Sequence, residues 1–313
     1  MLKLRRGINM SPGVYVTAKI LDGKALAQEI RSEVAAGVAE MQRNHGVTPG
    51  LAAVLVGDDP ASAIYVRNKR KACDEVGMVS DTICLPGNST TEKVLEAVDG
   101  LNKNPRFHGI LVQLPLPTQV DELAVIESMD PDKDVDGLHP FNVGKLVQGR
   151  ADFIPGTPAG IQQILLRSGH DPSGTNVVVC GRSDIVGKPM ALLLMQPAHG
   201  ANATVTVCHT HTKNMEEITS QADILVAAIG SPNAITADMV KEGAIVIDVG
   251  INRVTDDSRK RGYLLNGDVN FAEVSEKASA ITPVPGGVGP MTIAMLLVNT
   301  LTATRISIHG RVS

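Results

Sequence analysis

The chain has 313 residues, a formal net charge of −4, 43% hydrophobic residues and 20% charged residues. This length exceeds one comfortable hydrophobic core, so we expect a soluble globular enzyme with two domains. Tryptophan is absent and aromatic residues make up 2% of the chain. The chain therefore lacks both the positive charge and the stacking side chains typical of nucleic-acid-binding proteins.

The four cysteines are scattered without a CxxC pair, which indicates reduced thiols in a cytoplasmic protein. No apolar run approaches the length that spans a bilayer, so we expect no interaction with a membrane. Residues 1–17 carry basic side chains followed by glycine and proline. We expect this stretch to be a flexible extension, with a transit peptide as the less favoured alternative.

Helical and strand patterns alternate through the first half of the chain. Amphipathic periods are typical of helices, and short continuous apolar runs are typical of buried parallel strands. The predicted elements are a helix at 24–42, a strand at 51–57, a helix at 62–77, a strand at 81–86, a helix at 91–102 and a strand at 109–117. This order predicts an α/β domain over residues 18–155.

A turn-rich stretch at residues 131–149 precedes a second series of elements. The series comprises a helix at 157–169, a strand at 176–181, a helix at 186–196 and strands at 203–209, 222–230 and 244–252. This pattern predicts a Rossmann-like, doubly wound parallel sheet over residues 156–289. We expect two α/β domains flanking a cleft, with a final helix at 290–305 packing back on the first domain.

A stiff loop is predicted at residues 281–292 (ITPVPGGVGPMT), where half of the residues are glycine or proline. Prolines fix the backbone, and glycines let it pass close to a neighbour without a Cβ in the way. Such a loop can present main-chain groups to a flat ligand. Pro290 suits the first turn of the helix that follows.

The turn between the strand at 176–181 and the next helix contains Gly181 and Gly187. A dinucleotide fold binds its pyrophosphate at such a turn, because free helix N–H groups attract anions. The strand that follows ends without the carboxylate that holds the ribose of NAD. Arg182 and Thr210 instead suit the 2′-phosphate of NADP.

Three possible metal ligands, Cys208, His209 and His211, lie close together in the sequence. They lack a second cluster at ligand spacing, so we expect no metal site.

Five further residues have the chemistry of a reaction site. Tyr65 and Lys69 are four positions apart, which places them on one face of a helix. Gln113 lies near the carboxyl end of a predicted strand, the edge where open α/β sheets bind ligands. Asp134 and Asp136 lie in the loop sequence KDVDG, where carboxylates cap turns, bind a cation or accept hydrogen bonds from a ligand.

Seven segments of the chain, in order, resemble the bifunctional methylenetetrahydrofolate dehydrogenase/methenyltetrahydrofolate cyclohydrolase (FolD) family. The resemblance runs from about Ala18 to about Leu301. The segments are YVRNK, GILVQLPLP, PDKDVDGLHPFNVGKL, CGRSDIVGKPMALLL, ATVTVCHTHT, IDVGIN and TPVPGGVGPMT.

The resemblance implies roles for individual residues. Lys69 matches the catalytic lysine, with Gln113 beside it, Tyr65 stacking on the folate and Asp136 holding the pterin. The folate-contacting loop matches Pro285, Gly286 and Gly287. The positions that hold NADP match Gly181, Arg182, Ser183, Gly187, Thr210 and Ile251. The resemblance also implies a homodimer.

Two differences from the family pattern lie outside these residues. Gly156 stands where the family often has cysteine, and residues 197–200 resemble a small insertion before the strand at 203–209. The insertion could displace Thr210.

The resemblance implies two reactions in one-carbon metabolism. The methylene carbon of 5,10-methylenetetrahydrofolate gives a hydride to NADP⁺, and water then opens the methenyl product to 10-formyltetrahydrofolate. For the second step we expect Lys69 to act as general base and acid. The alternatives are another NADP-dependent small-molecule dehydrogenase and a catalytically silent NADP-binding regulator.

Overall fold

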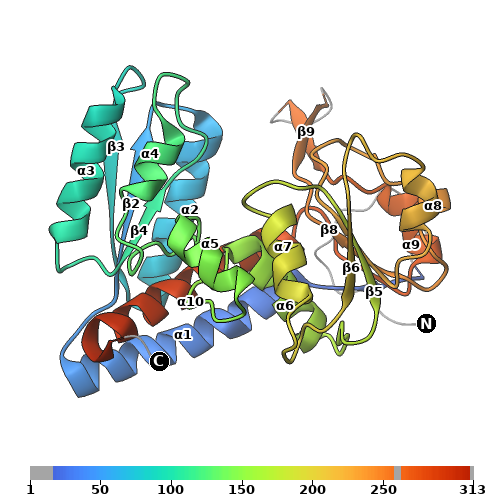
Figure 1. Ribbon diagram of the computed structural model, residues 1–313, viewed down its shortest axis with the longest axis horizontal. Coiled ribbons are helices and arrows are strands. Elements are labelled where there is room, and N and C mark those ends of the chain that lie inside the picture. Colours follow the sequence, from blue (N-terminus) through green and yellow to red (C-terminus); the bar gives the residue numbers. More distant parts are fainter. Residues whose placement is uncertain (1–16, 257–261, 311–313) are drawn as a thin grey trace.

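The computed structural model describes residues 17–256 and 262–310. All but the last residue of the predicted extension at 1–17 therefore lies outside the described residues. The chain forms two α/β lobes joined along one side by two long helices (Figure 1). This arrangement confirms the predicted class, two α/β units built on parallel sheets.

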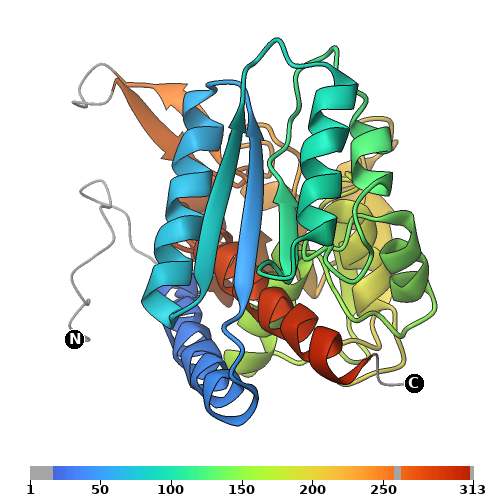
Figure 2. The same ribbon diagram turned by 90° about the vertical axis from the view of Figure 1, so that its left-hand side faces the viewer.

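The first lobe is built on a three-stranded parallel sheet with the order β3-β2-β4. All residues of the central strand are buried, because helices cover the sheet on both faces (Figure 2). The elements of this lobe are β2 (Gly50–Val56), α2 (Pro60–Val76), β3 (Val79–Leu85), α3 (Thr91–Lys103), β4 (Gly109–Val112), α4 (Glu122–Glu127) and α5 (Pro140–Val147).

The second lobe is built on a six-stranded parallel sheet with the order β1-β11-β8-β7-β5-β6. The strand order reverses at β5, as in a doubly wound sheet. Its strands are β1 (Lys19–Ile20), β5 (Asn176–Cys180), β6 (Thr204–Cys208), β7 (Ile224–Ala227), β8 (Ile245–Asp248) and β11 (Ala280–Ile281). Its helices are α6 (Gly156–Arg167), α7 (Gly187–Leu194), α8 (Met215–Thr219), the short 3-10 helix η1 (Ala237–Met239) and α9 (Phe271–Lys277). A separate antiparallel hairpin is formed by β9 (Asn252–Thr255) and β10 (Tyr263–Asn266).

Two long helices, α1 (Gly23–His45) and α10 (Val288–His309), run beneath the first lobe and reach α6 at the near side of the second lobe (Figure 1). The final helix was expected to pack back on the first domain; α10 contacts α1 and α2 and packs as extensively against α6 as against α1. It begins at Val288, so Pro290 lies in its first turn as expected. The strand β1 pairs with β11 in the second sheet, although it precedes the first lobe in sequence. The division into domains 18–155 and 156–289 stays a prediction.

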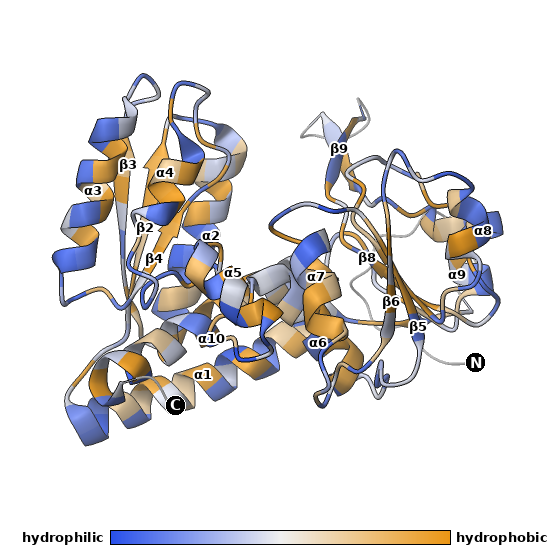
Figure 3. Cartoon of the chain, viewed as in Figure 1, coloured by the Kyte–Doolittle hydropathy of each residue, from blue (hydrophilic) through white to orange (hydrophobic). Residues whose placement is uncertain are grey.

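Among the described residues, one helix, α10, is long and apolar enough to cross a membrane by length and composition. The expectation that no apolar run reaches that length is therefore wrong for this segment. Several of its polar residues have hydroxyls that bond back to the helix, as Thr300 Oγ1 does to the carbonyl oxygen of Leu296 at 2.9 Å. Apolar side chains of α10, including Met291 and Leu297, belong to the hydrophobic core beneath the two lobes. Hydrophobic residues likewise follow the strands of both sheets (Figure 3).

Candidate active site

The helix α2 positions Lys69 under the carboxyl end of the first sheet. The side chain of Asp59 accepts a hydrogen bond from Ser62 N at 2.7 Å at the start of the helix. Pro60 follows at the first position, and Gly77 ends the helix in the left-handed conformation. Within this helix the side chain of Lys69 is partly buried, and its ammonium donates a hydrogen bond to Gln113 Oε1 at 3.1 Å.

Asp136 is presented by a turn that the neighbouring carboxylate fixes. Asp134 is fully buried, and its side chain accepts hydrogen bonds from the N–H groups of Leu138 and His139 and from Asn142 Nδ2, at 3.2, 2.8 and 2.9 Å. Of the two acids in KDVDG, Asp134 therefore caps the turn. Asp136 is left to line the cavity that also contains Lys69.

The helix α10 holds the same turn from below. Asn299 is a buried amide in an otherwise apolar stretch. Its Nδ2 donates to the carbonyl oxygens of Val135 and Ile154, at 2.7 and 2.9 Å. These carbonyls flank the turn of Asp136 and the connection between the lobes. A buried amide that satisfies two backbone groups ties both segments to one helix.

Burial and opposite charge act against each other on Lys69 and Asp136. Burial lowers the pKa of the Lys69 ammonium, and the nearby carboxylate of Asp136 opposes that shift. Burial raises the pKa of Asp136 to about 6, with the Lys69 charge lowering it and Asp134 adding to the rise. Burial therefore moves the pKa of each group towards neutral pH, which suits proton transfer.

Lys69, Gln113 and Asp136 line one cavity of about 160 Å³. Other residues that line this cavity come from segments outside the first sheet. They were not predicted from the sequence as site residues. They include Gly156 and Thr157 at the start of α6, Ile185 from the turn before α7, and Thr292 in α10. Ile185 is 48% exposed, which is unusual for isoleucine and fits a side chain that faces a ligand cavity.

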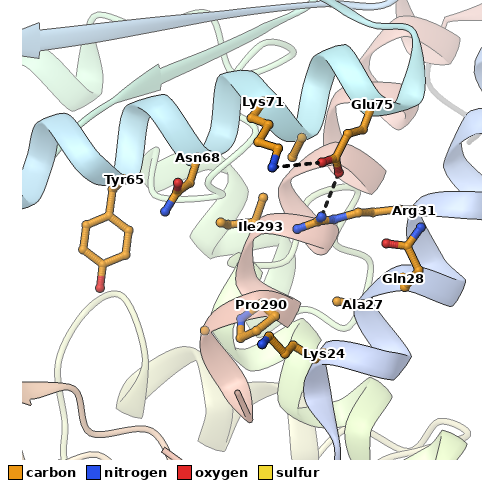
Figure 4. A pocket seen from close by; sticks show the side chains of 12 residues that line it. Lys24, Ala27, Gln28, Arg31, Tyr65, Asn68, Lys71, Glu75, Pro290 and Ile293 are labelled. Atoms are coloured by element: carbon orange, nitrogen blue, oxygen red, sulfur yellow. Dashed lines mark hydrogen bonds and ion pairs between the residues drawn. The ribbon is translucent and has the colours of Figure 1, made fainter. Parts of the chain in front are cut away.

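Tyr65 lines a different cavity, of about 470 Å³, between α1, α2 and the start of α10 (Figure 4). Tyr65 is 41% exposed. Positive side chains of Lys24, Arg31 and Lys71 line the same cavity. The last two form ion pairs with Glu75. Tyr65 and Lys69 thus lie on one helix, but they line two separate cavities.

The loop of prolines and glycines at 283–290 lines a third cavity, of about 230 Å³. Pro285, Gly286 and Gly287 lie in it together with Ile251. The loop is packed tightly against α1, since a Cβ added to Gly23 would lie 1.8 Å from the carbonyl oxygen of Gly287. Lys24, Gly289 and Pro290 line this cavity and that of Tyr65, so the loop separates the two.

The predicted nucleotide turn forms a fourth cavity, of about 230 Å³, at the carboxyl ends of β5, β6 and β7. Gly181, Arg182, Ser183 and Thr210 line it. Ser183 Oγ accepts hydrogen bonds from the N–H groups of Val186 and Gly187, at 3.2 and 3.4 Å, and so caps the start of α7. The turn at 197–200 does not remove Thr210 from this cavity.

Close backbone packing explains the glycines of this turn. A Cβ at Gly181 would lie 2.1 Å from the carbonyl oxygen of Ala228, and a Cβ at Gly187 would lie 2.1 Å from that of Gly181. Gly187 therefore shapes the turn but does not line the cavity. Ile251 lines the neighbouring cavity, at the end of β8. Within residues 17–256 and 262–310, no three His, Cys, Asp or Glu side chains gather as metal ligands.

Comparison with known families and proteins gives consistent matches over most of the chain. Residues 21–136 match the model of the tetrahydrofolate dehydrogenase/cyclohydrolase catalytic domain, and residues 155–308 match that of the NAD(P)-binding domain. The chain is 56% identical to the bifunctional protein FolD of Prosthecochloris aestuarii over 284 residues, which cover 90% of this chain and 96% of that protein.

Solved structures agree with these matches. The bifunctional FolD enzyme of Campylobacter jejuni is 46% identical, with a TM-score of 0.86 and coverage of 92% of this chain and 99% of that one. FolD of Trypanosoma brucei, solved with NADP cofactor and an inhibitor, is 41% identical, with a TM-score of 0.88 and coverage of 93% and 99%.

Proposed function

The chain belongs to the tetrahydrofolate dehydrogenase/cyclohydrolase family, and we propose that Lys69, Gln113 and Asp136 form the centre at which its two reactions occur. The protein is a bifunctional enzyme. It oxidises 5,10-methylenetetrahydrofolate with NADP⁺ to the methenyl compound, and hydrolyses that product to 10-formyltetrahydrofolate.

The turn after β5 fits NADP. Its cavity lies at the carboxyl ends of parallel strands, next to the start of α7, where anions bind. Arg182 would pair with the 2′-phosphate, and Thr210 would add a hydroxyl donor. Gly181 keeps the backbone free of a side chain where the pyrophosphate would approach. Bound NADP⁺ supplies the acceptor for the hydride of the bridging methylene carbon.

We assign the folate to the cleft between the lobes. The pterin edge carries adjacent N–H donors, and the carboxylate of Asp136 can accept two parallel hydrogen bonds from them. The exposed face of Tyr65 is available for stacking on an aromatic part of the substrate. The backbone of Pro285, Gly286 and Gly287 would contact the remaining surface. The protein's part in hydride transfer is then to fix the reacting carbon in position.

Hydrolysis needs a group that both removes and delivers a proton. Water adds to the cationic methenyl carbon and loses a proton, and the ring nitrogen that departs from that carbon takes one up. A lysine with a lowered pKa can do both. We assign these steps to Lys69, whose amine is held by Gln113 Oε1.

The observation that carries this assignment is the shared cavity of Lys69, Gln113 and Asp136. A single spectrophotometric assay tests it. Protein is mixed with methylenetetrahydrofolate and NADP⁺, and reduced cofactor and the methenyl absorbance are followed together. We expect reduced cofactor to accumulate, and we expect methenyltetrahydrofolate added separately to decay faster with the protein than without it. Absence of both signals would indicate a silent NADP-binding regulator.

We also propose that the enzyme is a cytoplasmic homodimer. The family resemblance supports the dimer, and the scattered cysteines support the compartment. Sedimentation of the purified protein tests the dimer directly, since a single species of one chain's mass would contradict it.

A further inference from the structure

We propose that Asp268 is a positioning residue for the nicotinamide half of NADP, and this inference rests on the proposed cofactor site. Asp268 lies between β10 and α9, and none of its surface is exposed. Its Oδ2 accepts hydrogen bonds from the N–H groups of Ile229 and Gly230, at 2.6 and 2.8 Å. Its Oδ1 accepts one from Asn252 Nδ2 at 2.8 Å. One buried carboxylate thus holds two separate segments of the second lobe.

Both segments lie at the carboxyl edge of the six-stranded sheet. Ile229 and Gly230 follow β7, and Asn252 begins β9 shortly after the end of β8. Ile229 lines the cavity of the nucleotide turn. Ile251, beside Asn252, lines the adjacent cavity of the proline and glycine loop. Asp268 therefore lies behind the wall that joins these two cavities.

The topology assigns this wall to one half of the cofactor. A dinucleotide crosses a doubly wound sheet at the point where strand order reverses, which is β5 here. Arg182 and Thr210 lie on the β5 and β6 side, where the 2′-phosphate of the adenosine half would bind. The other half must then extend over the ends of β7 and β8, where Asp268 fixes the backbone.

Asp248, at the end of β8, locks Asp268 in place. Its Oδ1 accepts from the N–H groups of Gly250 and Asp268, at 3.0 and 2.9 Å, and its Oδ2 accepts from Val269 N at 3.1 Å. The packing leaves no room for side chains, since a Cβ at Gly250 would lie 2.3 Å from Asp268 Oδ1. The position of the wall is therefore set by carboxylates and not by flexible packing.

The same cluster reaches the folate loop. The N–H of Asp248 donates to Thr282 Oγ1 at 2.8 Å, and Thr282 directly precedes Pro283 of that loop. Asp268 lines neither ligand cavity, so its carboxylate acts through the two backbone N–H groups and the Asn252 side chain that it holds. Its loss should move Ile229 and Ile251, which follow β7 and β8, and should leave Arg182 and Thr210 in place after β5 and β6.

Binding measurements on Asp268→Ala separate these two halves. Calorimetry would compare NADPH with adenosine 2′,5′-bisphosphate, which carries the adenosine half alone. We expect the NADPH dissociation constant to rise by at least about tenfold, and that of the bisphosphate to change by less than about twofold. Asp171→Ala is the matched control, because Asp171 is exposed and precedes the opposite end of β5. Equal losses for both ligands, or an unchanged NADPH affinity, would overturn the proposal.

The variant Asp268→Asn and a measurement of methenyltetrahydrofolate hydrolysis complete the test. If Asp268→Ala does not fold, Asp268→Asn decides. Its amide oxygen can still accept from Ile229 and Gly230, but its NH₂ group opposes Asn252 Nδ2, so we expect the same selective loss in weaker form. Hydrolysis of added methenyltetrahydrofolate without NADP by the control Asp171→Ala should stay within about twofold of wild type. A wild-type protein without folate activity would refute the proposed function but leave the two binding measurements valid.

Discussion

The ammonium of Lys69 donates a 3.1 Å hydrogen bond to Oε1 of Gln113, and Nε2 of that amide donates to the carbonyl oxygen of Leu114 at 2.8 Å. The second bond fixes the amide orientation, so that its oxygen faces the lysine. Lys69 is thereby directed into the cavity that Asp136 also lines. The neutral amide of Gln113 holds the lysine by a hydrogen bond. The nearby carboxylate of Asp136 favours the charged form of the lysine.

Asp136→Asn should move the acid limb of the cyclohydrolase pH profile to lower pH. The carboxylate of Asp136 raises the pKa of Lys69 against the effect of burial. Removing that charge lets the lysine pKa fall further, because burial then acts unopposed. The neutral amine that accepts a proton from water then persists at lower pH. The limb is measured as kcat at saturating methenyltetrahydrofolate, and a shift to higher pH would contradict the assignment of Lys69 as the base.

Arg182→Ala should raise the KM for NADP⁺ much more than that for NAD⁺. A guanidinium bound to a phosphate contributes about 1.5–3 kcal/mol, which corresponds to a roughly tenfold to hundredfold change in KM. NAD⁺ has no 2′-phosphate, so its KM should change little. Arg67→Ala, an exposed position on α2, serves as the control. Equal effects on the two cofactors would refute the phosphate contact.

Gly23→Ala should displace the folate loop from α1. The added Cβ would lie 1.8 Å from the carbonyl oxygen of Gly287, so either the helix or the loop must move. Overpacking of this kind costs about 1–3 kcal/mol. We expect a lower free energy of unfolding in denaturant and a higher KM for the folate. Gly100→Ala in α3, which meets nothing within 4 Å, should leave the KM unchanged and keep or raise stability.

Periodicity and composition predicted most of the regular structure. The helix now seen at Gly23–His45 and the strand at Gly50–Val56 were expected within a few residues. The two-residue strands β1 and β11 were missed, because a period cannot be read from so few positions. The packing of α10 on both lobes was missed for another reason: an apolar helix has no preferred face that the sequence could reveal.

The site could be predicted only in part. Motifs identified Lys69, Gln113 and Asp136, and the turn signal of KDVDG left three roles open for its acids: capping a turn, binding a cation or accepting hydrogen bonds from a ligand. The structure settles the capping role on Asp134, since its carboxylate is turned into the loop. Ile185 and Thr292 were not found, because they reach the cavity of Lys69 from distant segments that only the folded chain brings together.

We propose that one lysine, Lys69, carries the proton transfers of hydrolysis, while the cofactor and the cleft carry the oxidation. The most direct measurement is the rate of methenyltetrahydrofolate hydrolysis by Lys69→Met, with NADPH binding and thermal unfolding measured on the same sample. Loss of a general acid or base typically lowers the rate about 10²–10⁴-fold, and we predict a loss of that size in a folded protein that binds NADPH normally. Hydrolysis at the wild-type rate in that variant would contradict the account.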